Sequence, residues 1–261
     1  VLSLADGDAR GIYKTTNYDF RQFKKVEMYV HLEKVNEYDR EMDGDVRLFI
    51  RVGSDFQDNY YEYEIPLSYT GWYESAREID LEAMVAVKEH RNAAIRDGVP
   101  GILQTVPYSE VVGKARYTVK GTPAINSVKS ILIGIRNPQK QYIGDNDDGA
   151  PRSVNVWINE LSLNEFNKKS GVAVTARAQA NLGDLGNISV GGSYSTANFG
   201  SIEQKIAELP QENIGSYDVS VNLELGKFVP EKVGLKLPVH YDISSVISNP
   251  EYNPLVPDVK T

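Results

Sequence analysis

Four segments that follow Phe166 alternate strictly between apolar and polar side chains, and this pattern most constrains how the chain can fold. Successive side chains of a β-strand point to opposite faces of the sheet, so the alternation predicts strands with one apolar and one polar face. The predicted apolar rows are Val172, Val174, Ala176, Ala178 and Ala180; Ile188, Val190 and Tyr194; Tyr217, Val219, Val221, Leu223 and Leu225; and Val233, Leu235, Leu237, Val239 and Tyr241. The polar rows include Thr175, Arg177 and Gln179, and Asp218, Asn222 and Glu224.

The length of these segments, about 9 to 13 residues, is what a tilted strand needs to cross a hydrocarbon layer. The expected turns at 183–186 and 226–231 are short, whereas 196–215 is a long connection containing the helix-like stretch SIEQKIAEL. Such alternation of turn and loop is typical of outer-membrane barrels, although soluble sandwiches also have alternating strands, and both interpretations stay open. Pro238 lies on the polar row of the fourth segment and predicts an edge strand or a bulge.

The first part of the chain also shows strand patterns. Apolar side chains alternate over 26–33 and again over 46–52, and the Asp43–Gly44 turn signal between them predicts a hairpin. A third strand is expected over 60–65, ended by Pro66. These segments predict that the first part of the chain is rich in β-strands.

The spacing of apolar residues changes between Asp80 and Asp97, where it fits a helix that Asp80 caps and Gly98 ends. Short apolar runs at 130–136 and 154–163 predict two more strands. The alternation in the second run slips in phase, which a bulge at residues 159–160 would explain. The expected fold class is therefore mainly β with one helix.

Composition excludes several classes of function. The formal net charge of -8 argues against nucleic acid as a partner, because phosphate binding needs clustered Lys and Arg. The chain contains no Cys, which excludes disulfides and thiolate metal sites. It has no apolar run of the roughly 20 residues that a membrane-spanning helix requires. It begins at Val1 without an initiating Met, and we expect it to be an internal piece of a longer protein.

Residues that could carry chemistry are few. His31, His90 and His240 lie in separate segments without metal-ligand spacing. Glu62 and Glu64 share one strand face, which suggests a solvated face more than a glycosidase pair, because those carboxylates must oppose each other across the substrate. The sequence therefore predicts no catalytic residue, no cofactor-binding residue and no metal ligand.

Two local clusters leave alternatives open. Residues Asp145, Asn146, Asp147 and Asp148 with Gly149 offer oxygen ligands for calcium but lack the spacing of an EF-hand, so an acidic turn is the other interpretation. An aromatic group could stack on sugars or pack in a core or interface. Its members are Tyr60, Tyr61, Tyr63, Tyr69, Trp72 and Tyr73.

Several long stretches resemble one family. ADGDARGIYKTTNYDFRQFKKVEMYVH, DVRLFIRVGSDFQDNYYEYEIPL, VNVWINELSLNEFN and GSYSTANFGSIEQK are similar to the SprA (Sov) family of Bacteroidetes gliding motility and type IX secretion. The resemblance runs along nearly the whole chain. It implies an internal segment of a large outer-membrane translocon whose barrel conducts folded protein cargo, with partner proteins that gate or plug the pore. It brings no catalytic residues.

The resulting interpretation has three parts. Residues 1–166 are expected to form a soluble jelly-roll-like sandwich, 167–248 four barrel-type strands in two hairpins, and 249–261 a Pro-containing connector. Since a small barrel needs about eight strands, the remaining wall would lie outside this chain, and lipid would cover the apolar rows. The expected location is the outer membrane or cell surface. The alternative function is a soluble carbohydrate-binding module.

Overall fold

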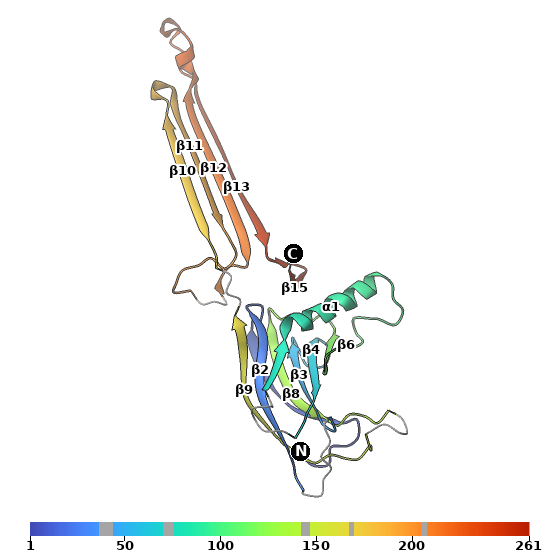
Figure 1. The fold of residues 1–261 in the computed structure, drawn as a ribbon. Coiled ribbons are helices and arrows are strands. Elements are labelled where there is room, and N and C mark those ends of the chain that lie inside the picture. Colours follow the sequence, from blue (N-terminus) through green and yellow to red (C-terminus); the bar gives the residue numbers. More distant parts are fainter. Residues whose placement is uncertain (37–43, 70–75, 142–146, 167–169, 205–207, 261) are drawn as a thin grey trace. The chain divides into compact units, whose positions relative to one another are not determined.

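The computed structural model describes residues 1–36, 44–69, 76–141, 147–166, 170–204 and 208–260. The chain divides into two compact units. Unit 1 comprises Val1–Asn167 with Val256–Val259, and unit 2 comprises Lys168–Leu255 with Lys260–Thr261. Both consist mainly of antiparallel strands, and the described residues form one α-helix (Figure 1). The predicted mainly-β fold class with one helix is confirmed.

Unit 1 contains two antiparallel sheets. The larger has the strand order β1 (Ala9–Tyr18), β8 (Val128–Arg136), β3 (Arg47–Gly53), β4 (Tyr60–Pro66), β7 (Ala115–Lys120) and β6 (Tyr108–Val112). The smaller has the order β5 (Ala76–Asp80), β2 (Phe23–Lys34) and β9 (Val154–Phe166). The single helix, α1 (Leu81–Arg96), directly follows β5.

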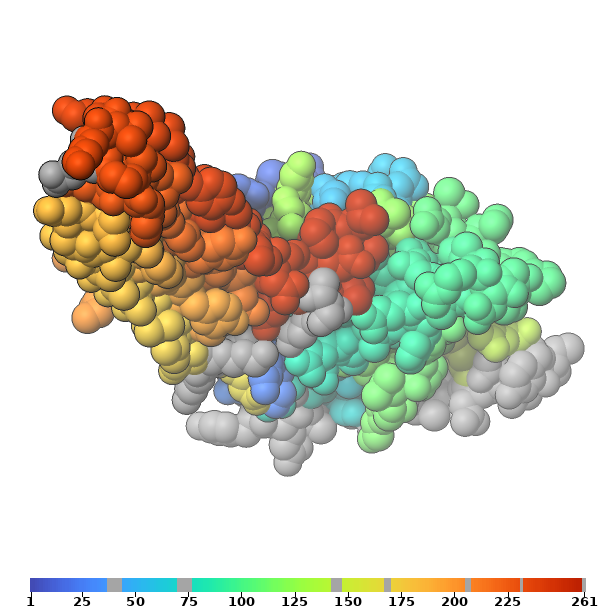
Figure 2. Space-filling model, turned by 90° about the horizontal axis from the view of Figure 1, so that it is seen from above, coloured from blue at the N-terminus to red at the C-terminus, as the bar shows by residue number. Residues whose placement is uncertain are grey.

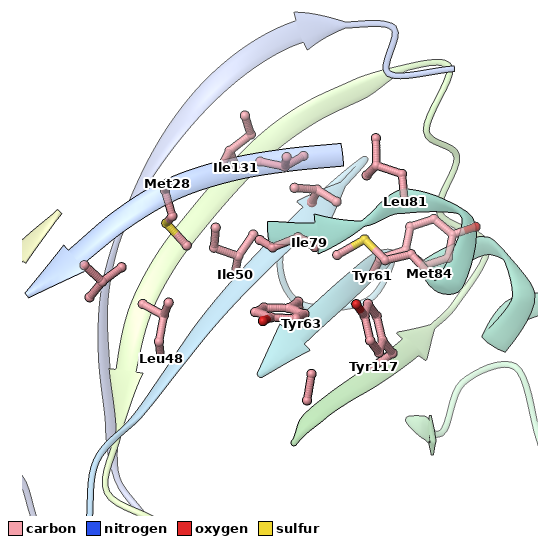
Figure 3. Packing of buried hydrophobic residues seen from close by; sticks show 14 of the residues in the cluster. Met28, Leu48, Ile50, Tyr61, Tyr63, Ile79, Leu81, Met84, Tyr117 and Ile131 are labelled. Atoms are coloured by element: carbon pink, nitrogen blue, oxygen red, sulfur yellow. The ribbon is translucent and has the colours of Figure 1, made fainter. Parts of the chain in front are cut away.

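The core of unit 1 lies between these two sheets. From β2, the alternate residues Val26, Met28, Val30 and Leu32 are all buried, as their spacing predicts. The facing rows of β3 and β4, with Leu48, Ile50, Tyr61 and Tyr63, complete the same cluster (Figure 3). Full burial of one such apolar side chain stabilises the fold by about 1.5 to 3 kcal/mol, so this shared core joins the two sheets into a sandwich.

The predicted hairpin between residues 26–33 and 46–52 is wrong. β2 pairs with β5 and β9, whereas β3 pairs with β4 and β8 in the other sheet. Both segments bury one apolar face in the same core from opposite sides, so their alternation is the same whether or not they are hydrogen-bonded to each other. In the predicted Asp43–Gly44 turn, Gly44 has a positive φ of +91°, whereas Asp43 lies outside the described residues.

The predicted helix and bulge are confirmed. The Asp80 carboxylate accepts hydrogen bonds from the backbone N–H groups of Glu82 and Ala83, and Gly98 adopts φ of +73° just beyond the helix. In β9, the pairing with β2 shifts register where Glu160 has φ of +52°. The bulge accounts for the slip of the apolar row from Ile158 to Leu161 and Leu163.

The C-terminal residues belong partly to unit 1. Residues 249–261, expected as a connector, include the end of β13, β14 (Tyr252–Asn253) and β15 (Val256–Lys260). The buried Asp258 carboxylate accepts hydrogen bonds from the Tyr61 hydroxyl at 2.6 Å, Lys88 Nζ at 2.9 Å and the Ile125 N–H at 2.7 Å. Figure 2 shows this segment, in red, beside α1, in teal. Residues 256–259 are therefore anchored in the core of unit 1.

Unit 2 is built on one four-stranded antiparallel sheet whose strands follow sequence order. They are β10 (Ala173–Asn181), β11 (Gly186–Ser195), β12 (Glu212–Glu224) and β13 (Pro238–Pro250). The four predicted amphipathic strands are confirmed, and the sheet is open, with β10 and β13 at its edges (Figure 1). Pro238 is the first residue of an edge strand, as its position predicted.

Two details of unit 2 differ from the predictions. The fourth strand begins at Pro238 and not at Val233, because Pro230 and the left-handed Gly234 (φ +64°) interrupt the chain. The preceding connection is long and carries the 3-10 helices η4 (Leu225–Phe228) and η5 (Glu231–Val233), so the short turn expected at 226–231 is wrong. The first turn is short as predicted, with η2 (Gly183–Leu185). Of the helix-like stretch, 201–204 forms a turn and 205–207 lies outside the described residues.

Candidate functional site

The register of the unit 2 sheet brings the apolar rows of all four strands onto one face. Val190 of β11 lies between Ala178 of β10 and Val219 of β12, and Val219 in turn pairs with Ile243 of β13. Because directly opposite residues in a sheet project to the same side, the apolar rows meet one another across the sheet. Of the predicted fourth row, Val239 and Tyr241 take part, whereas Val233, Leu235 and Leu237 precede β13. Further members of this apolar face are Val174, Ala176, Ala180, Ile188, Tyr194, Tyr217, Val221, Leu223, Val239, Tyr241 and Ile247.

The opposite face of the sheet is polar. Ser189 lies between Gln179 and Ser220, and Ser220 pairs with Asp242. Hydrogen bonds link polar side chains between neighbouring strands, such as Ser193 to Ser216 at 2.8 Å and Asn222 to Asn187 at 2.8 Å. On this face, Arg177 lies 3.9 Å from Asp218, also across the sheet. The side chains of this polar face therefore suit contact with water.

The apolar face is also open to its surroundings. Val174 is 59% exposed, Tyr241 56% and Ile247 64%, and β10 is exposed along its whole length. In a soluble sandwich a second sheet would cover such a face, but β10 to β13 form a single sheet, and the only other described strand of unit 2 is the two-residue β14. Contiguous exposed apolar surface of this kind marks a contact with a protein or a membrane.

Groups with potential for metal or acid-base chemistry are scattered. The histidines lie on β2, α1 and β13, each beside one carboxylate: His31 near Glu33, His90 near Glu110 and His240 near Asp242. Within the described ranges, no three His, Asp or Glu side chains are grouped so that they could hold a metal ion. Over the same ranges, no helix combines the length and apolarity needed to cross a bilayer.

The described part of the acidic loop, from Asp147 onward, is tied to one arginine. The Arg152 guanidinium lies 2.7 Å from the carboxylate of Asp148, 3.5 Å from that of Asp45 and 3.6 Å from that of Asp147. Asp148 also accepts a hydrogen bond from the Ala150 N–H. This pairing fits the acidic-turn interpretation for the described part, whereas Asp145 and Asn146 lie outside the described residues.

Of the expected aromatic group, Tyr60, Tyr61 and Tyr63 are distributed over both faces of β4, and Tyr69 follows this strand and packs against the core. Tyr61 and Tyr63 point into the core, where the Tyr63 and Tyr117 rings meet edge to face at 5.3 Å. Tyr60 points to the other face and is also buried. Trp72 and Tyr73 lie outside the described residues. Tyr61 and Tyr63 are therefore core residues, and Tyr60 is covered on the outer face of the sheet by Arg51, so none of the three forms an exposed sugar-stacking platform.

Glu62 and Glu64 are not on a solvated face, contrary to the prediction. Their exposed fractions are 4% and 1%, and arginines of the neighbouring strands cover them. Glu62 pairs with Arg51 at 2.6 Å and Arg136 at 3.3 Å, whereas Glu64 pairs with Arg47 at 3.0 Å. β4 lies inside the sheet between β3 and β7, so long side chains on both sides close over its outer face. Strand alternation alone does not show which residues flank a strand.

Comparison with known proteins identifies the family. A family model described as motility related/secretion protein, SprA_N, matches residues 1–261. A search of curated proteins finds no match. The match covers the sandwich of unit 1 and the two-faced sheet of unit 2 alike. The chain therefore belongs to the SprA family of motility-related and secretion proteins.

Proposed function

We propose that this chain is a structural and transport segment of a large outer-membrane translocon for protein secretion of type IX, and that it catalyses no reaction. In this role the sheet of unit 2 is one part of a larger barrel wall. Its apolar face contacts outer-membrane lipid, and its polar face lines the aqueous interior through which protein cargo moves. Unit 1 is a folded domain carried on that wall.

The observation that carries this proposal is the separation of the two faces across four paired strands. Ala178, Val190, Val219 and Ile243 lie opposite one another as one apolar row across the four strands, and the opposite face is mainly polar. The strands contain 9, 10, 13 and 13 residues, and a tilted strand needs about 9 to 11 to cross the hydrocarbon core. An exposed apolar sheet face of this length is suited to contact with membrane lipid.

The open edges of the sheet support the larger assembly. Backbone groups on the outer sides of β10 and β13 have no partner strand within the described part of unit 2. Unpaired edge groups are unfavourable in a hydrocarbon layer, so membrane barrels close completely. The remaining barrel strands of the parent protein are therefore the expected neighbours of β10 and β13, and other secretion-system proteins would gate or plug the pore.

A pair of adjacent substitutions tests this proposal. Val219→Arg places a charge on the apolar face, and Ser220→Arg places the same charge one residue away on the polar face. An Arg or Lys side chain on the lipid-facing side near the midplane of a bilayer lowers the stability of the inserted barrel by about 2 to 4 kcal/mol. We expect the full-length parent protein carrying Val219→Arg to be depleted from the outer-membrane fraction and secretion to fall, while Ser220→Arg is tolerated.

The two variants also separate the alternatives. Equal recovery of both proteins in the outer membrane would contradict a lipid-facing apolar row. A soluble carbohydrate-binding module would instead remain in solution without detergent, and Val219→Arg would leave its fractionation unchanged.

A further inference from the structure

The outer face of the six-stranded sheet in unit 1 carries more positive charge than its carboxylates neutralise. Arg51 pairs in register with Glu62, and Arg116 pairs in register with Glu64 across β4 and β7. Arg47 of β3 and Arg136 of β8 lie directly opposite each other in the same sheet. Four guanidinium groups therefore surround two buried carboxylates, and we call these six residues the arginine face.

Aromatic rings hold two of these arginines in fixed orientations. The guanidinium carbon of Arg51 lies 4.1 Å from the centroid of the Tyr60 ring, and that of Arg136 lies 4.8 Å from the Phe49 centroid. Gly134 leaves room for the Phe49 ring, because a Cβ atom there would approach Phe49 Cζ to 2.6 Å. Guanidinium groups stacked on rings lose less conformational freedom when a ligand binds.

The four arginines retain unused charge and hydrogen-bonding capacity. Their side chains are 23 to 42% exposed, so their outer edges reach solvent. Each guanidinium has five N–H donors, whereas Glu62 and Glu64 supply four oxygens and the Phe56 carbonyl, which accepts a hydrogen bond from Arg51, supplies one more. Arg116 is the most exposed and lies 3.6 Å from Glu64, a distance beyond hydrogen bonding. Within the described chain, the only carboxylates paired with these arginines are Glu62 and Glu64, which leaves two net positive charges on the face.

We infer that the arginine face is a docking surface for an acidic polypeptide segment of a partner protein. Arginine forms planar, bidentate pairs with carboxylates, and a cluster of four arginines matches that geometry. Lys120 of β7 also projects to this face of the sheet, but it is paired with Asp58 at 2.9 Å. Arginine and aromatic residues are also the types enriched at the energetic centres of protein interfaces. The charge is opposite to that of the chain as a whole, which is -8, so this face would steer a segment rich in Asp and Glu to one place.

This surface lies within unit 1, and the inference does not depend on the proposed membrane role of unit 2. The probe is a short polyglutamate peptide, titrated into the full chain by calorimetry in detergent at low and at physiological salt. Arg116→Gln removes one charge without removing a hydrogen bond from either buried carboxylate. Lys129→Gln removes one charge from an exposed side chain outside the arginine face and is the matched control.

We expect salt-sensitive binding that Arg116→Gln weakens by about fivefold, the effect of one partly exposed ion pair, while Lys129→Gln leaves it unchanged. Arg116→Lys, which keeps the charge but loses the planar fork, should weaken binding less than Arg116→Gln. The absence of polyglutamate binding, or equal weakening by Arg116→Gln and Lys129→Gln, would overturn the inference. So would a loss of binding to phosphatidylglycerol vesicles on Arg116→Gln without any loss of polyglutamate binding.

Discussion

Replacement of Asp258 by Ala should destabilise unit 1 strongly, although this residue is far in the sequence from the core strands that it joins. Its carboxylate is fully buried and accepts hydrogen bonds from Tyr61, Lys88 and the Ile125 backbone. The Lys88 side chain is only 5% exposed and donates a second hydrogen bond to the Pro123 carbonyl at 2.7 Å. Asp258→Ala therefore leaves the ammonium group of Lys88 buried without its counter-charge.

The magnitude follows from that buried charge. Removing one partner of a buried ion pair costs about 3 to 5 kcal/mol, a large part of the roughly 5 to 15 kcal/mol that stabilises a typical domain. At about 2 to 4 °C per kcal/mol for a domain of this size, the melting temperature of unit 1 should fall by about 6 to 20 °C. Near-ultraviolet circular dichroism of the core tyrosines during thermal unfolding measures this change.

A double variant separates the charge from the anchoring of the C-terminal segment. Lys88→Met combined with Asp258→Leu removes both charges, and we expect it to be more stable than Asp258→Ala alone, because a buried pair replaced by apolar residues is often neutral. A melting temperature within 2 °C of the wild type for Asp258→Ala, on the order of what less than 1 kcal/mol produces, would refute the reasoning. So would a double variant less stable than the single one.

Two further outcomes follow from unit 1. Burial, and then the neighbouring Tyr117, raises the pKa of Tyr63 to about 12, above the value near 10 of an unfolded chain. The folded state therefore binds more protons than the unfolded state between pH 10 and 12. The contribution of Tyr63 to the free energy of unfolding is fully present below pH 10 and falls by about 3 kcal/mol towards pH 12. Denaturant melts at increasing pH should show this decrease, and Tyr63→Phe should reduce it. Asp80→Ala should cost about 1 kcal/mol by removing the cap of α1, and an unchanged denaturation midpoint would show that the cap is dispensable.

The parts of the fold that the sequence predicts are those set by local periodicity. The helix after Asp80, the bulge near Glu160 and the rows of unit 2 each depend on side chains a few residues apart, and all three occur in the structure. Strand partners are different, because they depend on residues far apart in the chain. β2 and β3 show the same alternation as a hairpin would, yet they lie in different sheets.

The burial of polar residues also depends on partners that are far away in the sequence. Glu62 and Glu64 carry the alternation of a solvated face, and only the arginines of three other strands make that face buried. Arg116 and Arg136 are more than 50 positions away, and no local pattern links them to β4. Asp258 is still more distant from Lys88 in sequence, and a Pro-punctuated tail gives no sign that it enters a core.

The most direct test of the proposed contact between the unit 2 sheet and lipid uses single cysteines, since the chain contains none. Thiols are placed one at a time along β11 and β12 in the full-length parent protein in native outer membranes, and their reaction with a membrane-impermeant maleimide is measured. We predict that Ser189, Ser220 and Asn222 react when replaced by Cys, whereas Val190, Val219 and Val221 are protected when replaced by Cys. Equal reaction at both sets of positions, or protection of the polar row, would contradict a sheet with lipid on one side and water on the other.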